Sequence, residues 1–206
     1  MGTLLNRRRF LGGGGEEPLP QGAVKVEYLE STGTQYIDTG IYPDQDTGVE
    51  IEFSTSFTNS DREAFGARSY SRYYELLLDR SHYLYYQYGS STPIIAYGTN
   101  NLNYYYNWYA DKNVLRDLSN KTVLATLPEQ TFSISNTLYL FGLHSSSFQR
   151  GLVGRICYCK IYSNQILVRD FIPVRVGQVG YMYDKVSGTL IGNAGTGDFV
   201  LGPEKT

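Results

Sequence analysis

Residues 49–54 alternate apolar and polar side chains with a strict period of two. In an extended chain the two sets fall on opposite sides, Val49, Ile51 and Phe53 against Glu50, Glu52 and Ser54. Such alternation predicts a strand with one face in a core and the other in water. The chain must therefore build at least one sheet that has a buried face.

Similar short apolar and aromatic runs recur along the chain, separated by turn sequences such as Gly98-Thr99-Asn100-Asn101. No helical period lies between them, so parallel crossovers are not expected. The pattern predicts an all-β fold, an antiparallel sandwich or a barrel, and of these we favour a two-sheet antiparallel sandwich. The expected strands cover residues 24–29, 35–39, 49–54, 72–78, 82–88, 93–97, 104–109, 113–118, 122–127, 138–143, 152–162 and 166–174.

Composition narrows the class of protein further. A chain of 206 residues suits one sandwich domain, and we assign it to residues 23–206. The formal net charge of -2 argues against a nucleic-acid partner, which requires a surplus of basic residues. Since no run of eighteen apolar residues occurs, we expect no membrane span.

The two cysteines, Cys157 and Cys159, lie two residues apart in an apolar run. A regular strand points both side chains to the same face, and this spacing makes a mutual disulfide awkward. We therefore expect two free thiols.

Residues 1–22 differ from the rest of the chain and are predicted to form a flexible N-terminal arm. The arm carries a basic and apolar tip, followed by four glycines and a proline, the tip being Arg7, Arg8, Arg9, Phe10 and Leu11. The arginines superficially match a twin-arginine export signal, but glycines follow where an apolar segment is required. Either the arm anchors the domain to a partner, or it is a terminus without a role.

Catalytic groups are sparse. Glu50 and Glu52 share one strand face and are the best candidates for the two carboxylates of a glycosidase, but the acidic spacing Glu-x-Asp-x-x-Glu is absent. His82 and His144 lack neighbouring ligands for zinc. We predict a non-catalytic protein without a cofactor, with calcium at Asp44 and Asp46 as the one alternative for a metal.

Aromatic residues are dense between residues 70 and 109. Because adjacent residues of a strand face opposite ways, Tyr104, Tyr106 and Trp108 form one stripe, and Tyr105 and Tyr109 belong to the other. An exposed stripe suits stacking on sugar rings or a subunit interface, whereas a buried one is core. The candidate contact residues for a glycan or an interface are Tyr86, Tyr88, Tyr104, Tyr106 and Trp108.

Several segments at the two ends of the chain carry a family resemblance. They are EYLESTGTQYIDTG at 27–40, GRICYCKIY at 154–162, RDFIPV at 169–174, GYMYD at 180–184 and GNAGTG at 192–197. Together they resemble the LamG-like jelly-roll domains, of the concanavalin A-like class, that occur in gut Bacteroidales and their phages. The resemblance implies that the first and last strands share one sheet, with Phe199 and Leu201 packed in the core.

The resemblance also implies a function. We expect a structural or interaction module of a bacteriophage virion, such as a capsid decoration, head fibre or tail-associated protein. The arm would bind other virion proteins, the sandwich would face a host-surface glycan, and the protein would be a homo-oligomer, a trimer being one option. The alternative is a carbohydrate-binding domain of a bacterial surface or secreted protein, which would carry an export signal or lipoprotein cysteine.

Overall fold

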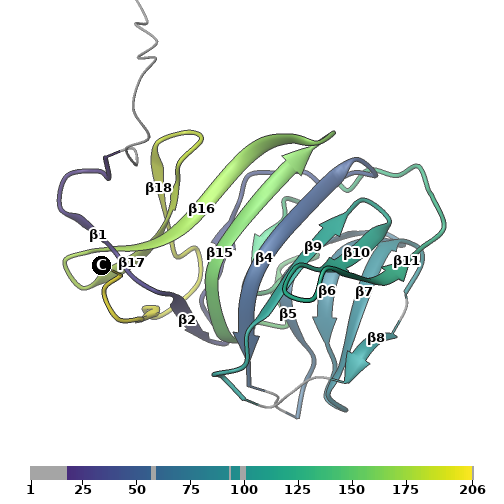
Figure 1. Cartoon of the computed structure of the whole chain (residues 1–206), viewed down its shortest axis with the longest axis horizontal. Helices are drawn as coiled ribbons and strands as arrows, with labels where there is room; N and C mark the ends of the chain where they lie inside the picture. Colours follow the sequence, from purple (N-terminus) through teal and green to yellow (C-terminus); the bar gives the residue numbers. More distant parts are fainter. Residues whose placement is uncertain (1–17, 57–58, 93, 98–100, 206) are drawn as a thin grey trace, which may run out of the picture.

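The computed structural model describes residues 18–56, 59–92, 94–97 and 101–205, and these form two facing sheets (Figure 1). The larger sheet has the order β11-β10-β9-β4-β15-β16-β17-β18, with β1, β2 and β19 alongside. Its strands are β1 (Ala23–Lys25), β2 (Leu29–Thr32), β4 (Thr47–Thr55), β9 (Tyr106–Asp111), β10 (Val114–Asp117), β11 (Thr122–Thr126), β15 (Val153–Ser163), β16 (Ile166–Val176), β17 (Val179–Asp184), β18 (Thr189–Gly192) and β19 (Val200–Leu201).

The smaller sheet has the order β14-β13-β5-β6-β7-β8, with β12 and β3 beside β5. Its strands are β3 (Ile37–Asp38), β5 (Arg62–Ser69), β6 (Arg72–Leu78), β7 (Tyr83–Gly89), β8 (Ile94–Tyr97), β12 (Tyr139–Leu140), β13 (Leu143–His144) and β14 (Phe148–Gln149). Nearly all pairings are antiparallel; β13 runs parallel to β5. The predicted all-β antiparallel sandwich is confirmed, and its form is compatible with a jelly roll.

The two ends of the described chain meet in the larger sheet. β1 pairs with β16, β2 pairs with β19, and Val26 forms a bridge with Glu204. Phe199 is buried in the core, and Leu201 packs against it. The expected proximity of the first and last strands is confirmed. The described residues contain no helix long and apolar enough to cross a membrane.

Several strand predictions need correction. The first expected strand is divided into β1 and β2, and β14, β17 and β18 were not among the expected strands. β5 was not predicted, because Ala64, Gly66 and Ala67 interrupt its aromatic and charged residues and hide the period of two. The single strand expected over 138–143 is two short strands, β12 and β13. Phe141 lies between them with a φ of 65°, a left-handed conformation that ends regular pairing.

The aromatic stripe of β9 points inward, so the prediction that it is open is wrong. Trp108 is only 3% exposed and meets the ring of Phe53 edge-on at 5.9 Å, while Tyr106 stacks on Phe53 at 5.1 Å. Asn107, between them, takes the outer face. The alternation of side chains along a strand places the two stripes on opposite faces, but it does not determine which face is buried.

Tyr86 and Tyr88, on β7, are also buried rather than available for contact. Burying a tyrosine requires a partner for its hydroxyl group. The Tyr86 hydroxyl donates to the carbonyl of Lys112 at 2.5 Å, and that of Tyr88 donates to the carbonyl of Gln45 at 2.9 Å. These rings therefore stabilise the core by joining β7 of the smaller sheet to the turn between β9 and β10 and to the segment before β4, where β4, β9 and β10 are strands of the larger sheet.

The two cysteines are free, but they do not share a face. A β-bulge between Ile156 and Tyr158 shifts the register of β15 against β4. The extra residue reverses the alternation, so Cys159 enters the core while Cys157 remains half-buried on the outer face. The expectation of a shared face assumed a regular strand and is wrong for this reason.

Truncation of the buried indole tests the inward assignment. We expect Trp108→Ala to lower the free energy of unfolding by about 3–5 kcal/mol, because it removes a large side chain from the core. Urea denaturation measures the change. Tyr70→Ala, at a residue that is 98% exposed, should change it by less than about 0.5 kcal/mol. Equal effects of the two substitutions would contradict this packing.

Candidate functional site

The larger sheet carries an open groove of about 1220 Å³ on its outer face. The groove forms where β15 changes neighbours: residues 153–156 pair with β2, and residues 159–163 pair with β16. Beyond Phe171, β16 leaves β15 and is flanked by β1 and β17. Figure 1 shows β16 curving away from β15 toward β17 and β18. The separation leaves a hollow floored by β4 and β15 and walled by β1 and β16.

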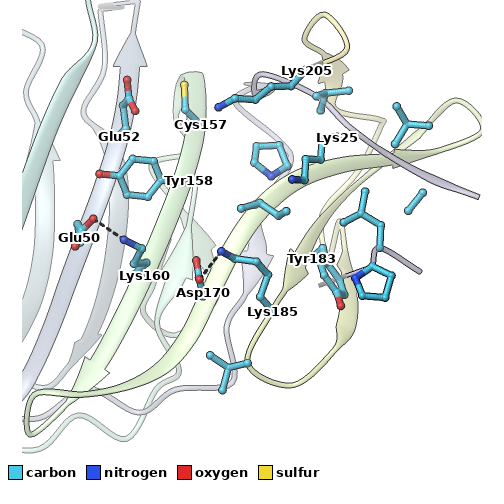
Figure 2. Close-up of a pocket in the computed structure, with 18 of the residues that line it drawn as sticks. Lys25, Glu50, Glu52, Cys157, Tyr158, Lys160, Asp170, Tyr183, Lys185 and Lys205 are labelled. Carbon is cyan, nitrogen blue, oxygen red and sulfur yellow. Dashed lines mark hydrogen bonds and ion pairs between the residues drawn. The ribbon is translucent and has the colours of Figure 1, made fainter. Parts of the chain in front are cut away.

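Four charged side chains of the groove form two ion pairs. Lys160 Nζ lies 3.0 Å from Glu50 Oε1, and Lys185 Nζ lies 2.6 Å from Asp170 Oδ2 (Figure 2). The hydroxyl of Tyr162 donates to the other oxygen of Glu50 at 3.2 Å. Both ion pairs are partly exposed, so they contribute little to stability. Their value is that they hold donors and acceptors in place along the groove.

Glu52 has a different environment from Glu50. Figure 2 shows its carboxylate beside Cys157 and facing the side of the groove that carries Lys205. Partial burial raises the pKa of Glu52, and the positive charge of Lys205 partly offsets the rise. Burial, reinforced by Glu52, raises the pKa of the Cys157 thiol to about 12. The thiol therefore stays protonated near neutral pH and is a poor nucleophile.

Half-exposed tyrosines continue the polar face beyond the groove. Tyr158 lines the groove and donates its hydroxyl to Asn107 Oδ1 at 2.7 Å. Tyr109 packs against Tyr162 with ring centroids 5.6 Å apart, and burial raises the pKa of both to about 12. All stay neutral at physiological pH, so their hydroxyls can both donate and accept. This face includes Tyr105 and Tyr109, the stripe that the sequence analysis did not select.

Of the five aromatic residues predicted to make contacts, Tyr104 alone is well exposed, at 49%. Its ring packs edge-on against Tyr106 at the end of the inward stripe. Tyr86, Tyr88, Tyr106 and Trp108 belong to the core and do not meet a ligand from solvent. The predicted anchoring residues Arg7, Arg8, Arg9, Phe10 and Leu11 lie outside the described residues.

The carboxylates considered for calcium have other partners. Asp44 Oδ1 accepts hydrogen bonds from the Asp46 amide and the Thr47 hydroxyl, which is the pattern of a turn. Asp46 pairs with Lys112 at 2.7 Å. Within the described part of the chain no three His, Cys, Asp or Glu side chains gather as metal ligands. The geometry gives calcium no support at this loop.

The structure also does not favour acid–base catalysis by Glu50 and Glu52. A glycosidase needs two carboxylates that face the scissile bond with free oxygens. Both oxygens of Glu50 are engaged, one by Lys160 and one by Tyr162. Glu50 therefore has no oxygen without a partner for this chemistry.

A second group of charges lies buried in the smaller sheet. Glu63 on β5 and Glu75 on β6 are fully buried, and Arg150 Nη1 lies 3.0 Å from Glu63 Oε1 and 3.9 Å from Glu75 Oε1. Arg68 Nη2 also contacts Glu75 Oε1, at 3.2 Å. Oε2 of each glutamate has no hydrogen-bond partner among the described residues. Burial raises the pKa of both, and their mutual repulsion raises that of Glu63 further.

The fold and the groove together define an all-β sandwich with a polar, aromatic concave face, compatible with a jelly roll. No protein-family model matches this sequence, and no curated protein is significantly similar to it.

The buried glutamates predict a pH dependence of stability. Because their folded pKa values are raised, their contribution is fully present below the ordinary glutamate pKa of 4.5 and is lost as the pH rises through the folded values. Glu75→Gln should flatten this decline, since glutamine cannot ionise. Thermal unfolding between pH 4 and pH 8 measures it. The exposed Glu129→Gln is the control, and an unchanged pH profile in Glu75→Gln would contradict the assignment.

Proposed function

We propose that the protein is a non-catalytic interaction module that binds a glycan in the groove of the larger sheet. The groove itself carries the proposal, because it combines carboxylates, ammonium groups and tyrosine hydroxyls on one concave surface. Sugars present many hydroxyls that need donors and acceptors, together with flat C–H faces that pack on aromatic rings. At about 1220 Å³ the groove exceeds the usual volume of a site for one small ligand, which suits an extended saccharide.

The ion pairs and hydrogen bonds of the groove support ligand binding, because they fix side chains before a ligand arrives. Side chains that are already held lose less conformational entropy when a ligand arrives. Lys160 is held by Glu50, and Tyr158 is held by Asn107. Leu167, Ile172 and Val186 add apolar surface on the β16 side of the groove. A ligand with alternating polar and apolar faces, as a sugar chain has, matches this arrangement.

In the same proposal, the module belongs to a bacteriophage virion, as a capsid decoration, head fibre or tail-associated protein. The support is the resemblance of residues 27–40 and 169–197 to LamG-like domains of gut Bacteroidales and their phages, together with a basic segment, Arg7 to Leu11, ahead of the sandwich. The basic segment would attach to other virion proteins. A homo-oligomer would present several grooves to a host-surface glycan and raise the avidity of weak sites.

Glycan binding can be tested with the purified full chain on a glycan array, followed by calorimetry with the best ligand. We expect Glu52→Gln to weaken binding about tenfold, because it removes a charged acceptor from the groove. Tyr158→Phe should weaken it less. The control Tyr70→Ala, on the smaller sheet, should bind normally. Full affinity in the double variant Glu52→Gln/Tyr158→Phe would show that the glycan does not bind in the groove.

The virion assignment has its own test. Mass spectrometry and immunogold labelling of purified phage particles should find the protein at repeated positions. Deletion of residues 1–22, which stops just before β1, should abolish attachment while leaving the sandwich folded. Attachment that survives this deletion would rule out the arm as the anchor. Detection in the bacterial envelope alone would support a bacterial carbohydrate-binding domain.

A further inference from the structure

A separate depression of about 450 Å³ lies at one end of the smaller sheet. Three arginines reach it from three parts of the chain: the first residue of β5, the turn between β6 and β7, and the segment between β14 and β15. The lining residues are Asn59, Ser60, Asp61, Arg62, Arg80 and Arg150. Every residue of this lining has a polar or charged side chain, whereas the groove of the larger sheet also has apolar residues.

Two of these arginines are positioned by acidic neighbours. Arg150 Nη1 is held from the protein interior by the buried Glu63 at 3.0 Å, and its Nη2 lies 3.8 Å from Asp61 Oδ2. The other oxygen of Asp61 accepts the backbone amide of Arg80 at 3.3 Å. These contacts hold the Arg150 guanidinium at the depression. The backbone amide of Arg80 is hydrogen-bonded to the same Asp61 carboxylate.

The charge of the lining is unbalanced. It holds three guanidinium groups and the single carboxylate of Asp61, in a chain whose formal net charge is -2. Behind the lining, Arg150 is also paired with the buried Glu63, whereas the Arg80 side chain extends from an exposed turn. Like charges brought together repel, and an anion placed among them relieves the repulsion. Guanidinium groups present several N–H donors in a planar fork, which matches a carboxylate or sulfate better than a single hydroxyl.

We propose that this depression binds the negatively charged unit of an acidic saccharide, with its carboxylate or sulfate group at Arg80 and Arg150. The neutral residues of the lining fit the rest of such a unit. The Asn59 amide supplies a donor and an acceptor for ring hydroxyls, while Asp61 holds the two arginines in place. The depression is on the smaller sheet, so this site is distinct from the groove and stands or falls independently of it.

Nuclear magnetic resonance of the full chain can test the site with defined probes: sodium glucuronate, glucose 6-sulfate and, as the neutral counterpart, glucose. We expect saturable shifts of the amides of residues 59–62 and of Arg80 with at least one of the two acids, and none with glucose. Arg80→Gln should weaken this binding about tenfold, because it removes one charge-assisted hydrogen-bonding group from an exposed position.

The matched control is Arg72→Gln, which removes the same charge from an exposed arginine at the start of β6, outside the depression. It should bind the acids as the unmodified protein does. The proposal is overturned by an absence of saturable shifts with both acids, by equal shifts with glucose, by full affinity in Arg80→Gln, or by equal losses in Arg80→Gln and Arg72→Gln. Because shifts are assigned to residues, binding in the groove is seen separately.

Discussion

The pairing of β4 with β15 is the constraint on which the other features of the sandwich depend. The two strands pair from Thr55 opposite Gly154 to Thr47 opposite Ser163, at the centre of the larger sheet. Since side chains alternate, this register decides which residues are core and which are groove. It places Ile51 between Trp108 and Cys159 on the inner side and leaves Glu50 outside. A slip by one residue would bury Glu50 and expose the core.

One irregularity in that pairing creates the outer hollow. The bulge at Cys157 lies where β15 exchanges β2 for β16, and bulges bend the strand that carries them. Pro173 lies on the diverging part of β16. It has no amide hydrogen to donate to a strand on the edge of β16 opposite β17. Its carbonyl instead accepts the amide of Val26, which joins the N-terminal segment to the sheet. The bulge in β15 and the divergence of β16 therefore together form the groove.

Many of the strands can be predicted from the local sequence pattern. The groove of the larger sheet cannot, because it depends on contacts between distant parts of the chain. The strand at residues 49–54 could be predicted because its alternation is uninterrupted, and the one at 72–78 because it is a short aromatic and apolar run. The choice between the Tyr104 and Tyr105 stripes, and the bulge at Cys157, depend on pairing partners distant in sequence. The groove brings together side chains from the N-terminal segment, β4, β15, β16 and β17 with Lys205. Glu63 and Glu75 are buried although acids usually face water.

The short pairing of β1 gives the sandwich a mechanical property. Three residues, Ala23 to Lys25, connect the preceding chain to β16, and the Lys205 amide fastens the other side of β1 by donating to the Lys25 carbonyl. These same residues wall the groove. Tension applied to the chain ahead of residue 18 therefore acts directly on the groove wall. A module tethered through that segment would have its binding surface coupled to the load on its tether.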